Sequence, residues 1–132
     1  MPYSVFYGRT EAVKLMLKLG FDPMARGMDG GTLLHAACWV GNAEIVELLL
    51  RDYRNRIDLN ARDPKHSGTP LGWAIHGSTN CGYQRANHAR AVELLIEAGV
   101  RPANLNDLGS DAVRAVLLRN GIQPQPSQNQ QT

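Results

Sequence analysis

The sequence predicts an all-α fold, a solenoid of stacked helix-turn-helix units joined by extended, hairpin-like loops. A helix-forming segment recurs at an offset of 33 residues, from Glu11 to Glu44, and two further copies begin at Ala91 and Asp111. Each copy has apolar residues at positions i, i+3 and i+4, which is the period of a helix with one buried face. Repeated units of this kind stack so that each contacts its neighbours.

A shorter helix is expected before two of these segments, over residues 31–37 and 68–74. Thr32 and Thr69 are placed as N-caps, because a threonine hydroxyl accepts a hydrogen bond from a free backbone N–H of the first turn. Pro70 falls at the first helical position, where its missing N–H costs nothing. These features predict two helix starts.

The longer helices carry end signals of their own. Asn42 and Ser110 are placed as N-caps of the second and fourth copies. Gly20, Gly99 and Gly121 stand just after the helical segments, where a left-handed backbone conformation is needed. The order of elements is therefore short helix, tight turn, longer helix and extended loop.

This pattern resembles the ankyrin repeat. Residues 30–37 read Gly-x-Thr-x-Leu-His-x-Ala, and residues 41–50 read Gly-Asn-x-Glu-Ile-Val-x-Leu-Leu-Leu. The loop at 58–63 is similar to the linker of that family. The resemblance runs from about residue 3 to about residue 121 and implies an ankyrin-repeat solenoid.

We expect one repeat domain over residues 1–121, followed by a disordered tail rich in Gln and Pro at 122–132. The domain divides into a partial unit, two longer units and a C-terminal cap: 1–26, 27–63, 64–103 and 104–121. The third unit contains an insertion at 78–90, which should lengthen the turn between its helices or add a turn to the second helix. A repeat of this form resembles those of bacterial ankyrin proteins.

Composition favours a globular protein without nucleic-acid or membrane function. The net charge is +2, from 14 basic and 12 acidic residues with no Lys/Arg run. The apolar stretches are shorter than the roughly 20 residues that a membrane span needs. Cys38 and Cys81 form no CxxC pair, and the N-terminus has no signal-peptide pattern, so we expect a cytoplasmic monomer.

The resemblance implies a protein–protein interaction module that binds a protein partner of unknown identity through loop tips and the concave helix face. Phe6, Trp39 and His76 should form one column of side chains at the helix ends, while Trp73 is expected to pack against the adjacent repeat or under the insertion. His35 should bond a loop of its own or a neighbouring repeat. The expected partner-binding residues are Phe6, Tyr7, Met28, Asp29, Trp39, Val40, Lys65, His66, His76, Tyr83 and Arg85.

Two other functions remain open. The chain can be a structural C-terminal segment of a larger ankyrin protein, since its first unit begins inside its own first helix. It can also be a metal- or thiol-dependent enzyme that uses Cys81 and His88, with His66 and His76 as further ligands. Their spacing matches no metal or catalytic motif, so we expect neither a cofactor nor an enzymatic activity.

Overall fold

The computed structural model describes residues 10–25, 30–65, 67–80, 86–102 and 108–122. Within these residues the secondary structure is helical, as the sequence predicts, and no strand occurs. The elements in chain order are α1 (Thr10–Lys18), α2 (Leu33–Val40), α3 (Ala43–Asp52), the short 3-10 helix η3 (Arg54–Arg56), α4 (Pro70–Asn80), α5 (His88–Glu97) and α6 (Asp111–Arg119).

The predicted caps start the helices. Thr32 Oγ1 accepts a hydrogen bond from the His35 N–H, and the imidazole of His35 accepts one in return from the Thr32 N–H, which closes a capping box at α2. Asn42 and Ser110 cap α3 and α6 through their side-chain oxygens. Pro70 is the first residue of α4. These predictions are confirmed.

The predicted helix ends are also confirmed. Gly20, Gly99 and Gly121 have φ angles of 98°, 97° and 78°, in the left-handed region that a side chain makes costly. Each loop can therefore leave its helix sharply.

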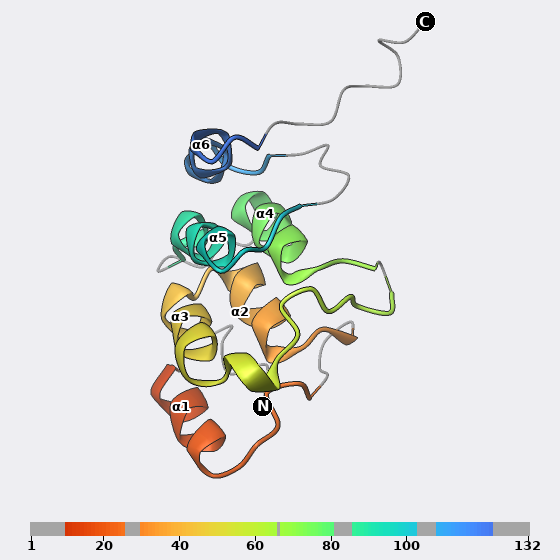
Figure 1. The fold of residues 1–132 in the computed structure, drawn as a ribbon, viewed down its shortest axis with the longest axis vertical. Coiled ribbons are helices and arrows are strands. Elements are labelled where there is room, and N and C mark those ends of the chain that lie inside the picture. The colour runs from red at the N-terminus through yellow and green to blue at the C-terminus, as the bar shows by residue number, and fades with distance from the viewer. Residues whose placement is uncertain (1–9, 26–29, 66, 81–85, 103–107, 123–132) are drawn as a thin grey trace, which may run out of the picture.

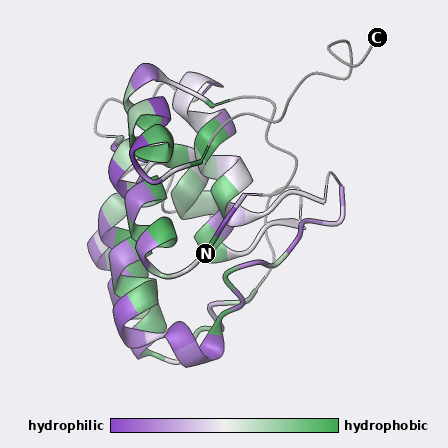
Figure 2. Cartoon of the chain, turned by 45° about the horizontal axis from the view of Figure 1, so that its top comes forward, coloured by the Kyte–Doolittle hydropathy of each residue, from purple (hydrophilic) through white to green (hydrophobic). Residues whose placement is uncertain are grey.

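The helices form two columns (Figure 1). The longer second helices of the units, α1, α3, α5 and α6, lie along one side, and the first helices, α2 and α4, lie beside them. Residues with no exposed surface run from Val13 in α1 to Leu117 in α6, so the core is continuous along the stack. Figure 2 shows the hydrophobic segments facing this interior.

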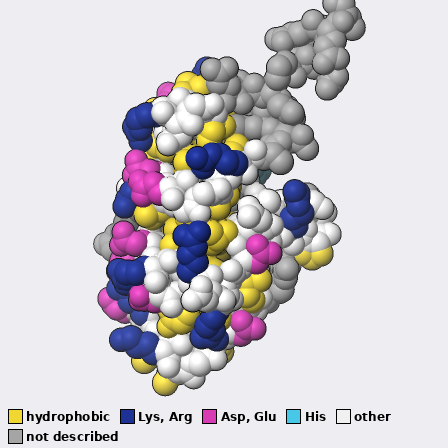
Figure 3. Space-filling model, in the orientation of Figure 1, with side chains coloured by type: hydrophobic (Ala, Val, Ile, Leu, Met, Phe, Trp, Pro, Cys, Tyr) yellow, Lys and Arg dark blue, Asp and Glu magenta, His cyan; other side chains and the backbone are white. Residues whose placement is uncertain are grey.

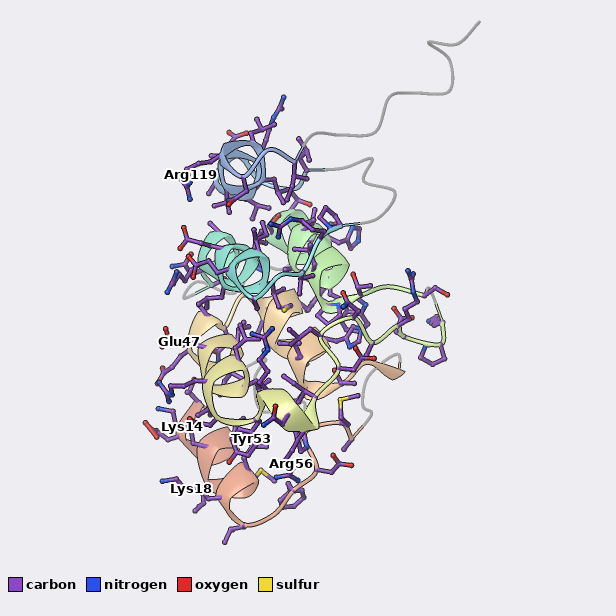
Figure 4. All side chains as sticks on the ribbon, in the orientation of Figure 1. Lys14, Lys18, Glu47, Tyr53, Arg56 and Arg119 are labelled. Atoms are coloured by element: carbon purple, nitrogen blue, oxygen red, sulfur yellow. The ribbon has the colours of Figure 1, made fainter. Side chains whose placement is uncertain are left out.

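The second helices carry the charged side of the molecule. Lys14 of α1 pairs with Glu44 of α3 at 2.7 Å, and Arg119 of α6 pairs with Glu93 of α5 at 3.0 Å. Figure 3 shows side chains of both signs interleaved along this side, and Figure 4 shows Lys14, Glu47 and Arg119 directed outward from it. Exposed pairs of this kind contribute about 0–1 kcal/mol each, so they add little to the stability of the fold.

The insertion lengthens the first helix of its unit. α4 has 11 residues where α2 has 8, whereas α5 and α3 both have 10. The connection between the helices is also longer, residues 81–87 against 41–42, which agrees with the first of the two predicted alternatives, whereas the added turn in the second helix is wrong. The extra part of α4 is held by Ser78, whose hydroxyl donates to the Ile75 carbonyl and accepts from the Ser110 N–H. Residues 81–85 of the insertion lie outside the described residues.

The C-terminal boundary differs slightly from the prediction. Ile122, assigned to the tail, is half-buried against the core, and its N–H donates to the Leu117 carbonyl. The rest of the predicted tail, residues 123–132, lies outside the described part of the chain.

Candidate partner-binding surface

Trp39 is the exception in an otherwise buried helix. Every other residue of α2 is buried, and Trp39, one residue before the end of the helix, is half-buried. The two positions beside it, Cys38 and Val40, have at most 1% of their surface exposed. α2 therefore presents one side chain to the outside, and that side chain is an indole.

The rings of Trp39, Trp73 and His76 lie in contact, and we call these three residues the aromatic patch. The Trp39 and His76 centroids are 5.5 Å apart with the rings tilted by 38°. The two indoles meet edge to face at 6.3 Å. The predicted neighbourhood of Trp39 and His76 is confirmed, whereas Phe6, the third member of the expected column, lies outside the described residues.

Trp73 is held by the loop before its helix. Its Nε1 donates to Asp63 Oδ2 at 2.9 Å, and the same carboxylate, 1% exposed, accepts from the backbone N–H groups of Lys65 and Gly68. A Cβ at Gly31 would stand 2.7 Å from the Trp73 ring, so the indole fits closely against the neighbouring unit. The expectation that Trp73 packs against an adjacent repeat is confirmed.

His35 ties two units together. Its Nδ1 accepts from the Thr32 N–H at 3.1 Å, so the neutral ring carries its proton on Nε2. That Nε2 donates to the Gly68 carbonyl at 2.9 Å, in the loop that leads to α4. The predicted inter-repeat bond of His35 is confirmed.

His88 fixes the backbone below Trp39, a role that the sequence did not indicate. Its Nε2 donates to the Trp39 carbonyl at 2.7 Å, and the Asn87 N–H donates to the Gly41 carbonyl at 2.7 Å. Burial lowers the pKa of His88, and the bond to Trp39 opposes this shift in part. The ring lies so close to Gly41 that a Cβ there would be 2.7 Å from Nδ1. The end of the insertion is thus clamped to the end of α2.

The other predicted binding residues divide into three groups. Val40 is 1% exposed and packs in the core, so its expected contact with a partner is wrong: the last turn of α2 directs this side chain into the stack. Lys65 and His76 are exposed. The remaining seven lie outside the described residues: Phe6, Tyr7, Met28, Asp29, His66, Tyr83 and Arg85.

The proposed metal and thiol chemistry finds no assembled site in the described part of the chain. There, no three His, Cys, Asp or Glu side chains come together as a metal cluster would require. His66 and Cys81 lie outside that part, and His88 already donates to a backbone carbonyl. Cys38 is buried, and burial raises the pKa of its thiol far above the usual range.

Comparison with known proteins places the chain in a family. The family model "Ankyrin repeats (3 copies)" matches residues 2–107. The chain is also 32% identical over 75 residues to Protein PhlB of Serratia liquefaciens, a match that covers 57% of this chain and 32% of that protein. The chain thus spans about a third of this relative. None of the helices among the described residues has the length and apolarity to cross a membrane.

The family match covers most of the chain and agrees with the structure. The capped helices, the left-handed glycines after them and the two-column stack all follow the repeat pattern of the sequence. Ankyrin repeats are generally protein–protein interaction modules. The chain belongs to the ankyrin-repeat family.

Proposed function

We propose that the chain binds a protein partner through the aromatic patch of Trp39, Trp73 and His76. The observation that carries this proposal is the exposure of Trp39 at the end of a helix that is otherwise buried. Aromatic side chains in partly desolvated surroundings are the usual centres of protein interfaces. A partner that covers the patch would bury apolar surface that the fold itself leaves open.

Rigidity of the patch supports the proposal. The Trp39 ring lies against the rings of Trp73 and His76, and the Trp73 indole donates to Asp63. Because both tryptophans are held before a partner arrives, less side-chain entropy is lost on binding. The surface is therefore prepared for contact.

The proposed interface extends beyond the patch. Lys65 is exposed in the loop that holds Trp73, and the seven predicted residues outside the described part belong to the same proposed surface. We infer in addition a monomeric bacterial protein that acts in the cytoplasm without catalysing a reaction. The similar protein comes from Serratia liquefaciens, a bacterium, and this supports the inference of a bacterial source.

A capture experiment with matched variants tests the proposal. The full chain, Trp39→Ala, His76→Ala and Lys18→Ala are used as baits in a lysate of the source organism. Lys18 is an exposed residue of α1, on the opposite column, and serves as the control. We expect a partner that both patch variants lose and the control retains, with affinity reduced by about 1 kcal/mol or more for each patch variant. Equal capture by all four baits, with thermal melts showing folded protein, would contradict the proposal.

A structural role in a larger ankyrin stack is the second candidate. It is favoured by Leu15 of α1, which is 57% exposed, whereas Leu48 and Leu94 at the equivalent positions of α3 and α5 are 9% and 8% exposed. Leu19 is 72% exposed on the same helix. An apolar face that is covered in the other units favours a further unit against α1. Light scattering separates the two: a stable monomer favours the module, and concentration-dependent association that Leu15→Glu abolishes favours the stack.

A further inference from the structure

The charges of the molecule are divided between its two columns of helices. α2 and α4 contain no Asp, Glu, Lys or Arg, whereas α1, α3, α5 and α6 each carry both signs. The acidic side chains of the described helices therefore lie on the second helices. The aromatic patch, which belongs to α2 and α4, has no helical carboxylate on its own elements.

The acidic residue that contacts Trp73 is held away from the surface. Asp63 is buried, and its carboxylate accepts three hydrogen bonds, from Lys65, Gly68 and Trp73. In the part of this loop from residue 61 to residue 69, the exposed Lys, Arg, Asp and Glu side chains among the described residues are Arg62 and Lys65, both cationic, whereas the exposed Asp58 lies earlier in the loop. The part of the loop next to α4 thus carries two exposed cations, while its carboxylate, Asp63, is buried.

The patch itself offers hydrogen-bond donors. The Trp39 indole N–H and the Nε2 of His76 have no acceptor among the described residues, and neither belongs to a buried unsatisfied group. The edge of an indole that carries the N–H is the positive end of the ring's charge distribution. The rings of His76 and Trp73 already cover part of the Trp39 indole. Its N–H group is therefore available to donate a hydrogen bond to a partner.

We propose that the partner presents an acidic linear segment, in which an aromatic side chain lies on the patch and a neighbouring carboxylate accepts from Trp39 Nε1 and His76 Nε2. This inference rests on the proposed function and names the chemistry of its partner. A carboxylate forms charge-assisted hydrogen bonds with such donors and meets the cations of Arg62 and Lys65 without repulsion from an exposed acid of α2 or α4. A basic segment would meet these cations and find no carboxylate on the patch.

Peptide selection on the full chain tests this chemistry. A phage library of random 12-residue peptides is selected on the wild-type chain after removal of peptides that bind Trp39→Ala, and the survivors are sequenced. We expect enrichment of Phe, Tyr or Trp with Asp or Glu within three positions, and depletion of Lys and Arg. Replacing Asp by Asn in a selected peptide should weaken binding at least fivefold in a fluorescence anisotropy titration.

Trp39→Phe isolates the donor. Phenylalanine keeps an aromatic ring and lacks the N–H, so this variant should prefer the Asp form of a peptide over the Asn form by a smaller factor than the wild-type chain does, with the His76 donor still in place. Lys18→Ala, remote from the patch, should retain the full preference for the Asp form. A circular-dichroism melt of each variant shows that the fold is intact.

The outcomes separate this inference from the proposed function. Peptides that depend on Trp39 but are rich in Lys or Arg, or that show no loss on replacing Asp by Asn, would overturn the acidic partner and leave the binding surface standing. If selected peptides bind Trp39→Ala and His76→Ala as tightly as the wild-type chain, or if none is selected, both proposals fail.

Discussion

The two first helices of the stack, α2 and α4, occupy equivalent places and serve different ends. α2 buries its histidine, His35, in bonds to two loops, and exposes one side chain. α4 has Gly72 at the equivalent position and Trp73 one residue later, where α2 has Ala36, and it exposes His76. His35 of α2 contacts the neighbouring unit through a hydrogen bond, whereas Trp73 of α4 contacts it through its indole ring and stays partly exposed. The comparison shows that both helices contribute to the aromatic patch, whereas the buried histidine that bonds two loops belongs to α2 alone.

The largest expected difference between the two helices is in the unfolding free energy lost when the histidine of each is replaced by alanine. His35→Ala removes the acceptor of the Thr32 N–H in a buried site, removes one of the hydrogen bonds to the Gly68 carbonyl, which keeps the Asp63 N–H, and leaves a cavity, so we expect the unfolding free energy to fall by about 2–4 kcal/mol. His76→Ala removes an exposed ring and should change it by less than about 0.5 kcal/mol. Urea denaturation followed by circular dichroism measures both. Similar losses for the two variants would remove the distinction between the helices.

Gly77 of α4 should tolerate no side chain. A Cβ at this position would lie 2.2 Å from the Trp39 carbonyl oxygen, and backbone cannot yield as a flexible side chain does. We expect Gly77→Ala to cost about 1–3 kcal/mol and to weaken the bond between His88 and the same carbonyl. Denaturation gives the cost, and the near-ultraviolet circular dichroism of the tryptophans reports the displacement. A variant as stable as the wild type would mean that α2 and α4 are less closely packed than the structure shows.

Acid should loosen the contact between the insertion and α2. Burial lowers the pKa of His88 in the folded chain below its ordinary value of 6.5, so the unfolded chain binds the proton more readily. The stability that neutral His88 contributes is therefore complete above pH 6.5 and is lost as the pH falls below it. Unfolding free energies measured between pH 8 and pH 5 should decrease toward acid, and His88→Gln should reduce that decrease. The same pH profile for both proteins would exclude His88 as its source.

Gly72 of α4 should accept a side chain with a small gain. The nearest atom to a Cβ at this position is Thr69 Oγ1, at an ordinary contact distance of 3.5 Å. Alanine lowers the conformational entropy of the unfolded chain, so Gly72→Ala should stabilise the protein by about 0.5–1 kcal/mol. A thermal melt beside Gly77→Ala compares two glycines of one helix with opposite expected signs. Destabilisation by Gly72→Ala would show that this position is less open than its contacts indicate.

The fold was predictable because its signals are local. Thr32, Asn42 and Ser110 lie within three residues of the N–H groups that they cap, and Gly20 follows its helix directly. The periodic apolar positions then decide which face is buried. Caps, left-handed glycines and apolar periodicity act within one repeat, so they can be recognised without knowing the contacts between repeats.

The site was predictable only in part, because its less obvious contacts cross the chain. His88 reaches Trp39 over 49 residues, and the insertion between the helices of the third unit hid this relation by breaking the repeat spacing. The added part of α4 was missed for the same reason. Its Ser78 hydroxyl accepts a hydrogen bond from the Ser110 N–H, a contact that the repeat pattern did not predict. Val40 was misplaced because its position at the helix end was taken to mean exposure, whereas neighbouring residues of a helix lie on different faces, and Val40 lies on the buried one.

The aromatic patch also makes the protein its own optical probe. The chain contains two tryptophans, Trp39 and Trp73, and both belong to the patch. The intrinsic indole emission of the whole chain therefore arises at the proposed binding surface, beside His35 and His76, whose rings lie 4.9 and 5.5 Å from an indole. A ligand that covers this surface should shift the emission to shorter wavelength as water is displaced, and a ligand on the charged side of the stack should leave the spectrum unchanged.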